Sequence, residues 1–335
     1  MSLSATVGDA PLDKVKFITR GFGWAMLATL VVWNFNNILN LTFGWPSARP
    51  FIEAGFFSDG GWRSAFQFAL YALGIGLAVG WVYCSQHISL RGDAARISNF
   101  NRYLVRGAFF AVLFVGLGDL VVSFLRVEGF LLPIVGEDLT RSLGRSQFRG
   151  PWLHIPLMIL GMLVALRAKT LGFHWLTLLI VIAELAIVIT RFVFSYEQAF
   201  MGDLVRFWYA ALFLFSSAYT LLEEGHVRVD IFYAGMKNKT KGFINAVGSL
   251  LLGMTLCWTI LVASLGGKSA IVYGTVRNFE ISQSGFGLYV KYLMALFLVV
   301  FAITMLIQFV SYLMESVADV REEEGTRLNR EVTMD

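Results

Sequence analysis

Apolar residues fall into eight runs that are almost free of charge and are separated by more polar stretches. The runs cover about residues 21–43, 63–83, 107–125, 151–166, 171–194, 204–222, 243–267 and 286–314. Because a helix rises about 1.5 Å per residue, about 20 apolar residues cross a hydrocarbon core about 30 Å thick. The pattern therefore predicts an all-α integral membrane protein with about eight transmembrane helices. The run 151–166 is short and contains Pro151 and Pro156, so it either spans obliquely or is re-entrant.

Composition and charge exclude a soluble protein. Of the 335 residues, 57% are hydrophobic and only 15% are charged, which is typical of helical membrane proteins. The formal net charge is +4, but Lys and Arg lie in short loops between apolar runs, where they orient helices. This placement argues against nucleic-acid binding. Cys84 and Cys257 both lie in apolar runs, so neither a CxxC motif nor a disulfide framework is expected.

The basic residues predict how the chain is oriented. Arg91, Arg96, Arg102 and Arg106 form a compact basic loop, which the positive-inside rule places in the cytoplasm. With eight spans, both termini are then cytoplasmic. If residues 151–166 do not span, the N-terminus lies outside, whereas the segment 221–241 and the C-terminus stay inside. The first apolar run is longer than a signal-peptide core and no small-x-small cleavage site follows it, so we expect a retained helix.

Asp119 and Glu184 are charged residues within apolar runs, and we expect Glu184 to be buried. A carboxylate in a membrane is costly unless it is paired, protonated or hydrated, so both are candidate functional residues. Arg126 and Arg191 each lie seven positions further along, on the same helical face, and could reach back to pair with them. Two interpretations stay open. The carboxylates either pair with other helices, or they form a proton or cation relay in an independent membrane protein.

Two further polar sets lie near the ends of apolar runs. Asn36 and Asn40 are one turn apart, and we expect them to point toward protein or the headgroup region, because amides in lipid need hydrogen-bond partners. Arg141, Arg145 and Arg149 recur at every fourth position. On a helix they would form a basic stripe suited to a membrane surface. The other interpretation is a solvated loop.

The sequence lacks the motifs of membrane enzymes and of ATP-driven pumps. Haem ligation needs histidine pairs at matched depth, but His87, His154 and His174 lie at the ends of apolar runs and His226 lies in a loop. The chain contains no HExxH zinc motif and no GxxxxGK(S/T) phosphate loop. We therefore expect no catalysis, no metal and no cofactor. No pair of interrupted helices typical of self-contained secondary transporters is evident either, which favours an accessory role.

Three short patterns in the second half resemble those of one family of bacterial solute-uptake systems. In chain order they are Arg191-Phe192-Val193-Phe194, Gly202-Asp203-Leu204-Val205-Arg206-Phe207 and Glu224-Gly225-His226-Val227-Arg228-Val229-Asp230. Over about residues 172–316 the chain resembles the four-helix small membrane (Q-type) subunit of tripartite ATP-independent periplasmic (TRAP) transporters. Gly202 departs from an acidic residue of the family pattern, and Phe192 and Phe207 depart from tyrosines.

The resemblance implies an enlarged form of this subunit in three parts. Residues 1–170 would be an N-terminal extension of about four helices, residues 171–316 the four-helix unit, and residues 317–335 a polar tail. In this family a large membrane subunit binds sodium and moves an organic anion, such as a carboxylate, that a periplasmic binding protein delivers. The small subunit is then an accessory scaffold in the bacterial inner membrane. Its expected partners are the large subunit, the binding protein and lipid, with sodium held by the large subunit.

The resemblance also suggests which charged residues contact other subunits. We expect Arg191, Asp203 and Arg206 to organise the periplasmic end of the subunit. The cytoplasmic end is expected to be organised by Glu224, His226, Arg228 and Asp230.

Overall fold

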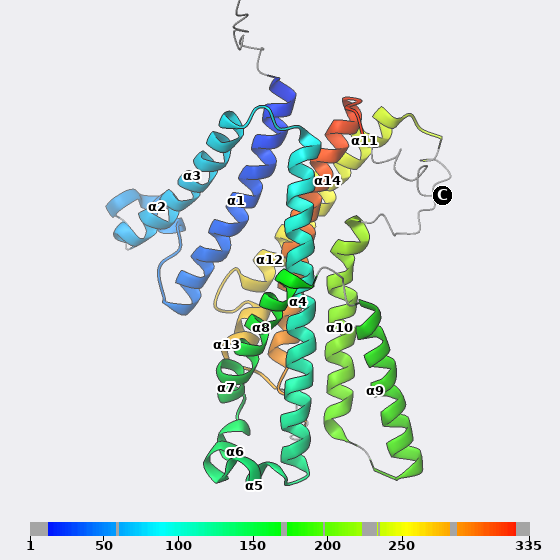
Figure 1. Cartoon of the computed structure of the whole chain (residues 1–335). Helices are drawn as coiled ribbons and strands as arrows, with labels where there is room; N and C mark the ends of the chain where they lie inside the picture. The colour runs from blue at the N-terminus through cyan, green and yellow to red at the C-terminus, as the bar shows by residue number, and fades with distance from the viewer. Residues whose placement is uncertain are drawn as a thin grey trace, which may run out of the picture. The chain divides into compact units, whose positions relative to one another are not determined.

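A computed structural model describes residues 13–57, 60–168, 173–196, 198–222, 233, 235–281 and 287–325, and within these ranges the chain is helical without a strand (Figure 1). The longer helices are α1 (Lys14–Thr42), α3 (Gly61–Cys84), α4 (Leu90–Val127), α8 (Ile155–Arg167), α9 (Phe173–Val193), α10 (Ala199–Leu222), α11 (Asn238–Gly248), α12 (Thr255–Leu265) and α14 (Lys291–Val320). The shorter ones are α2 (Arg49–Ala54), α5 (Leu131–Val135), α6 (Glu137–Leu143), α7 (Ser146–Arg149) and α13 (Ile271–Arg277). A 3-10 turn, η1 (Gly55–Phe57), and two π-helical turns, η2 (Gly150–His154) and η3 (Ser249–Met254), complete the described elements.

The described part of the chain contains eight helical segments that are long and apolar enough to cross a membrane. This confirms the predicted all-α membrane fold with about eight spans. One of these segments is Ser146–Arg167, in which α7, η2 and α8 follow one another without a break. Pro151 lies in the π turn, where the helix is already widened. The run that the sequence left open is therefore of spanning length, which favours the eight-span topology.

Helix α4 begins much earlier than the sequence pattern predicts. Its apolar part starts at Gly107, but the helix starts at Leu90 and continues to Val127. Arg91, Arg102 and the other arginines of the predicted basic loop therefore lie on the first part of a long helix. Hydropathy indicates only the part of a helix that lies within the membrane. Residues with good helix propensity extend α4 beyond that part.

The chain divides into two units, each built from separate parts of the sequence. The first unit comprises residues 1–96, 231–249 and 310–335, and the second comprises residues 97–230 and 250–309. Both units contain residues from before and after position 170. The division into an N-terminal extension, a four-helix unit and a tail stays a prediction.

In the first unit, α1 packs along α3 (Figure 1). The side-chain amide of Gln67 donates to Asn40 Oδ1 at 2.6 Å, and its backbone carbonyl accepts from Asn36 Nδ2 at 3.3 Å. Both asparagines thus point toward protein, which is one of the two predicted alternatives. At the start of α4, Asp93 Oδ2 accepts from Arg20 Nε of α1 at 2.6 Å and from Trp24 Nε1 at 2.9 Å. These contacts bind α1 to α3 and to the start of α4.

The same unit joins the start of α4 to the end of α14. Arg91 donates Nη1 to Glu315 at 2.8 Å and Nη2 to Asp319 at 2.7 Å, and all three side chains are largely buried. Ser311 of α14 also donates its hydroxyl to the Ala94 carbonyl at 2.8 Å. We call Arg91, Glu315 and Asp319 the Arg91 junction.

The second unit has an apolar core between α4, α9, α10 and α14. The ring of Phe297 on α14 lies 5.1 Å from that of Phe207 and 5.0 Å from that of Phe215 on α10. Helix α8 packs against α4, and its Gly161 lies directly on the α4 backbone. A Cβ at Gly161 would come 2.4 Å from the Ala111 nitrogen. This close packing places the α7–η2–α8 segment beside the second half of α4, where Asp119 lies.

Candidate functional site

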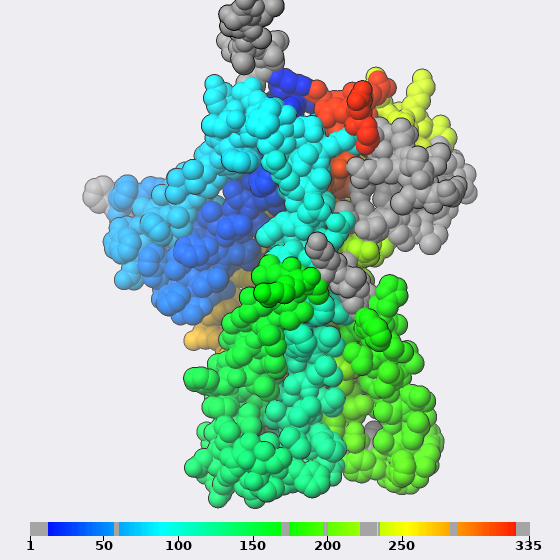
Figure 2. Space-filling view, in the orientation of Figure 1, coloured from blue at the N-terminus to red at the C-terminus, as the bar shows by residue number. Residues whose placement is uncertain are grey.

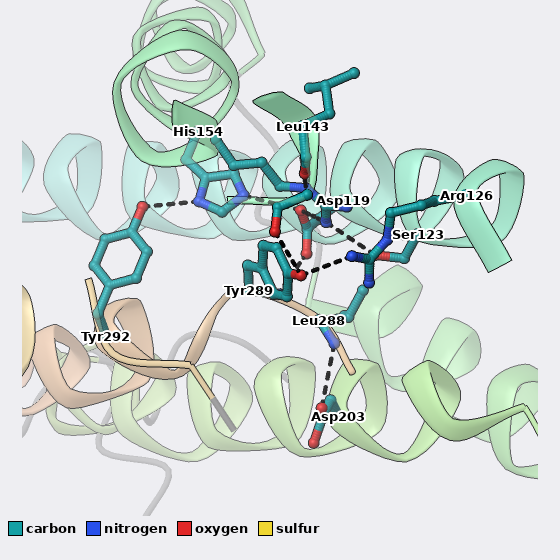
Figure 3. Close-up of polar contacts among 11 residues, drawn as sticks. Asp119, Ser123, Arg126, Leu143, His154, Asp203, Leu288, Tyr289 and Tyr292 are labelled. Atoms are coloured by element: carbon teal, nitrogen blue, oxygen red, sulfur yellow. Dashed lines mark hydrogen bonds and ion pairs between the residues drawn. The ribbon is translucent and has the colours of Figure 1, made fainter. Parts of the chain in front are cut away.

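Asp119 is the centre of a buried polar cluster in the second unit (Figure 3). Its Oδ1 accepts from Arg149 Nη1 at 2.7 Å and from His154 Nε2 at 3.1 Å. Its Oδ2 accepts from the backbone N–H of Tyr289 at 2.8 Å. Asp119, Arg149 and His154 have no exposed surface. Both carboxylate oxygens are therefore engaged within the chain.

The local fold explains why Arg149 and His154 reach the same carboxylate. Arg149 ends α7 and His154 ends the π turn η2, in which hydrogen bonds join residues five apart. Residues at this spacing lie on one side of such a turn. Between them, Gly150 allows the Phe279 ring to approach the backbone closely, because a Cβ at Gly150 would come 2.3 Å from Phe279 Cε1. On α4, Ser123 lies one turn beyond Asp119 and accepts from Arg149 Nη1 at 3.0 Å.

Two tyrosines complete the cluster from the other side. The Tyr292 hydroxyl lies 2.8 Å from His154 Nδ1, so the two ring nitrogens of His154 contact Tyr292 and Asp119. The guanidinium carbons of Arg149 and Arg126 lie 4.3 Å and 5.1 Å from the centre of the Tyr289 ring, a cation–π arrangement. Arg126 Nη1 also donates to the Tyr289 hydroxyl at 2.8 Å. We call this set the Asp119 junction: Asp119, Ser123, Arg126, Arg149, His154, Tyr289 and Tyr292.

The junction holds the start of α14. Two consecutive backbone N–H groups donate to carboxylates. The N–H of Leu288 donates to Asp203 of α10 at 3.2 Å, and the N–H of Tyr289 donates to Asp119 of α4 at 2.8 Å. These groups precede α14, which begins at Lys291. Negative charge near a helix N-terminus is favourable, because the unpaired N–H groups there carry a partial positive charge. The arrangement therefore fixes three helices relative to one another within the unit.

The geometry suits a structural role better than proton transfer. A relay carboxylate must exchange protons with water or with a neighbouring carrier, whereas Asp119 is enclosed and accepts three hydrogen bonds. Glu184, the other carboxylate of the predicted relay, does not belong to the junction. Among the described residues, no group of three or more His, Cys, Asp or Glu side chains could hold a metal ion. Cys84 and Cys257 are free thiols.

Three sequence predictions about charged residues were wrong. Arg126 does not pair with Asp119, because Arg149 and His154 occupy that carboxylate. Arg149 is buried rather than part of an exposed basic stripe, while Arg141 pairs on the surface with Glu137 at 2.8 Å. Glu184 is exposed, because α9 turns a different face toward α10. These contacts depend on which segments meet in space, which helical spacing alone does not specify.

The three residues predicted to organise the periplasmic end do not share one environment. Asp203 is mostly buried and Arg206 Nη1 lies 3.8 Å from its Oδ1, so these two lie together at the start of α10. Arg191 is exposed on α9, and no hydrogen bond or ion pair joins it to another described residue. The predicted cytoplasmic set, Glu224, His226, Arg228 and Asp230, lies outside the described residues. The roles of all seven in subunit contact stay predictions.

Sequence reasoning missed His154, Tyr289 and Tyr292. His154 lies just after Pro151, where the apolar run begins, so hydropathy alone places it at the membrane interface. A usable signal was the combination of Arg149 and His154, five residues apart, with an unpaired aspartate in the preceding apolar run. A buried carboxylate requires such partners.

Comparison with known proteins finds a family match in the second half of the chain. Residues 179–318 match the family described as the DctQ component of tripartite ATP-independent periplasmic transporters. No curated protein and no solved structure matches the chain. The matched region includes α10 and α12, most of α9 and nearly all of α14, so it overlaps the four helices for which the sequence resemblance was stated. The match of residues 179–318 therefore supports the resemblance of this part of the chain to the small membrane subunit of TRAP transporters.

Proposed function

We propose that this chain is the scaffold subunit of a sodium-coupled TRAP importer of organic anions. The observation that carries the proposal is the DctQ match over residues 179–318. The Asp119 junction supports it, because its buried charges are used for internal pairing rather than offered to a solute. In this role the chain enlarges the fixed part of the membrane complex and does not itself form the transport path.

The other components follow from the same proposal. A large membrane subunit binds sodium and the organic anion, and a periplasmic binding protein delivers the anion to the complex. The chain lies in the bacterial inner membrane with both termini in the cytoplasm. This orientation is supported by the eight candidate spans and by the arginines at the start of α4.

Co-purification and reconstitution test the proposal directly. The chain is expressed with the large membrane subunit from the same bacterium, purified in detergent and placed in liposomes with the binding protein. We expect a stable complex whose uptake of a carboxylate needs both membrane subunits and an inward sodium gradient. The chain alone should transport nothing. Proton or cation flux through the chain alone, abolished by Asp119→Asn or Glu184→Gln, would support the independent relay instead.

The signature segment allows a second test at the level of residues. We propose that Arg228 and Asp230 act as an oriented pair at the cytoplasmic end, so Arg228→Ala and Asp230→Ala should each reduce uptake and recovery of the complex. Exchanging the two residues should not restore either. Wild-type uptake and recovery in all three variants would show that these charges are only solvated.

A further inference from the structure

Glu184 is an exposed carboxylate in the middle of a transmembrane helix. It lies eleven residues after the start of α9 and nine before its end, so about 13–17 Å of helix separates it from either end. A glutamate side chain is too short to reach the membrane surface from there, unlike the longer Arg191 near the end of the helix. No hydrogen bond or ion pair joins Glu184 to another described residue. Within the described part of the chain, nothing therefore compensates its charge.

The side of α9 that carries Glu184 has the pattern of a helix-packing seam. Exposed residues recur on this side at alternating spacings of four and three: Thr177, Val181, Glu184, Val188 and Arg191. This is the repeat by which two helices interlock their side chains. A second seam, shifted by one residue, already packs against α10: Leu176, Ile180, Ala183 and Ile187. Helix α9 thus uses one seam within the chain and leaves the side with Glu184 exposed, so its side chains form part of the outer surface of the unit (Figure 2).

A second copy of this chain does not fit the exposed seam. Two copies in one membrane share the same orientation, so residues at equal depth meet across a two-fold axis normal to the membrane. That contact would place Glu184 against Glu184, two like charges in a medium of low dielectric constant. Arg191 of the other copy would lie about 10 Å away along the helix axis.

We propose that this seam binds a transmembrane helix of the large membrane subunit that presents a Lys or Arg side chain at the depth of Glu184. The inference rests on the proposed function and specifies the contact through which the two membrane subunits assemble. The valines Val181 and Val188 flank the carboxylate and shield the ion pair from lipid and water. Polar contacts between membrane helices are retained because the alternative partner is hydrocarbon.

Substitutions along α9 test the contact in the co-expressed complex. Glu184→Gln removes the charge while keeping the shape, and Val188→Trp places bulk in the seam. Ile182→Trp is the matched control, because Ile182 is equally exposed but lies about 160° around the helix from Glu184. We expect E184Q and V188W each to lower the recovered complex about tenfold, the effect of losing one interhelical contact. I182W should give wild-type recovery, and each variant chain purified alone should remain monodisperse.

The outcomes separate this contact from the proposed function. If the wild-type chain binds the large subunit and E184Q and V188W bind it equally well, the seam is not the contact but the scaffold function stands. If Glu184 faced lipid in its protonated form, E184Q would be neutral and Glu184→Leu would be tolerated, which overturns the inference. If the wild-type chain fails to bind the large subunit at all, both proposals fail. Cysteine cross-links from position 188 to a basic helix of the large subunit would confirm the contact.

Discussion

Asp119 and Glu184 show two ways in which a carboxylate is accommodated in a membrane helix. Asp119 has three partners within the chain and no exposed surface, whereas Glu184 is exposed among valines and leucines. Removal from water disfavours the charged form of both carboxylates, so what distinguishes the two residues is the partners available to each. Asp119 therefore stabilises the fold, whereas Glu184 has no partner among the described residues and, on our proposal, pairs with another subunit.

Replacing Asp119 tests its role in the fold. Asp119→Asn leaves Arg149 buried without its counter-charge, and removing one partner of a buried pair typically costs about 3–5 kcal/mol. We expect a loss of that size in the free energy of unfolding in detergent. Ser123→Ala should cost about 1 kcal/mol, because Arg149 loses only one neutral acceptor.

A double substitution provides the control for Asp119. Arg149→Met in the Asp119→Asn background removes the uncompensated charge, so the double variant should be more stable than Asp119→Asn alone. An Asp119→Asn variant within about 1 kcal/mol of wild type would contradict the assigned role, because Arg149 would then have to find compensation elsewhere.

The contact between Asp13 and Arg321 predicts a pH dependence outside the membrane spans. Arg321 donates Nη1 to Asp13 Oδ1 at 2.8 Å, and this hydrogen bond lowers the pKa of Asp13 below its ordinary value of 3.8. The stabilisation is therefore complete above that value and is lost as the pH falls through the lowered pKa. Because the Asp13 side chain is 40% exposed, we expect no more than about 1 kcal/mol at neutral pH.

Unfolding of wild type and Asp13→Asn between about pH 6 and pH 3 measures this dependence. Asparagine keeps the N-cap of α1, where Asp13 accepts from the Lys16 N–H at 3.2 Å, so only the charge changes. The difference between the two proteins should shrink toward zero at the acidic end. A difference that grows on acidification would have the wrong sign for this contact.

At the level of elements, hydropathy predicts what the membrane requires and little more. It gives the number of spans, because each needs a run of about 20 apolar residues. It misses the first 17 residues of α4, since helix formation outside lipid depends on propensity and tertiary contacts. Hydropathy also does not specify which face of α9 packs against α10, which is why the prediction that Glu184 is buried was wrong. The partners of Asp119 were missed because α7 and η2 must first fold back along α4.

Close packing of α8 on α4 gives a prediction for one element pair. A methyl group at Gly161 would meet the Ala111 backbone at 2.4 Å, and backbone cannot move aside as a flexible side chain can. Gly161→Ala should therefore separate the two helices and lower stability by about 1–3 kcal/mol, as overpacking does. Gly76→Ala on α3 is the matched control, because nothing lies within 4 Å of its added Cβ.

Thermal unfolding in detergent distinguishes the two glycine variants. Gly76→Ala should be neutral or slightly stabilising, because alanine favours the helix by about 0.5–1 kcal/mol. Equal midpoints for Gly161→Ala and wild type would mean that α8 and α4 can move apart at no cost, contrary to the tight contact.

For the whole molecule, the main question is how residues 1–170 relate to the region that matches DctQ. In the first unit, Arg91 binds Glu315 on α14. In the second, Asp119, Arg149 and His154 bind the start of α14 through Tyr289 and Tyr292. Each unit thus has its own buried polar contact between the two parts of the sequence. From these contacts we expect the additional helices to be needed for the fold of the region that matches DctQ.

Splitting the chain between α8 and α9 tests this integration. Residues 171–335 expressed alone would expose Glu315 and Tyr292 of α14, together with Tyr289 just before this helix, all of which make buried contacts in the whole chain. We expect this fragment to aggregate in detergent. Co-expression with residues 1–170 as a separate chain should restore a monodisperse pair, because both junctions can re-form between the fragments. Asp119→Asn in the first fragment should weaken the rescue, whereas Glu53→Gln, in an exposed pair with Arg49, should not. A monodisperse, thermally stable 171–335 fragment would instead show that the DctQ region folds independently and that the extension serves a separate purpose.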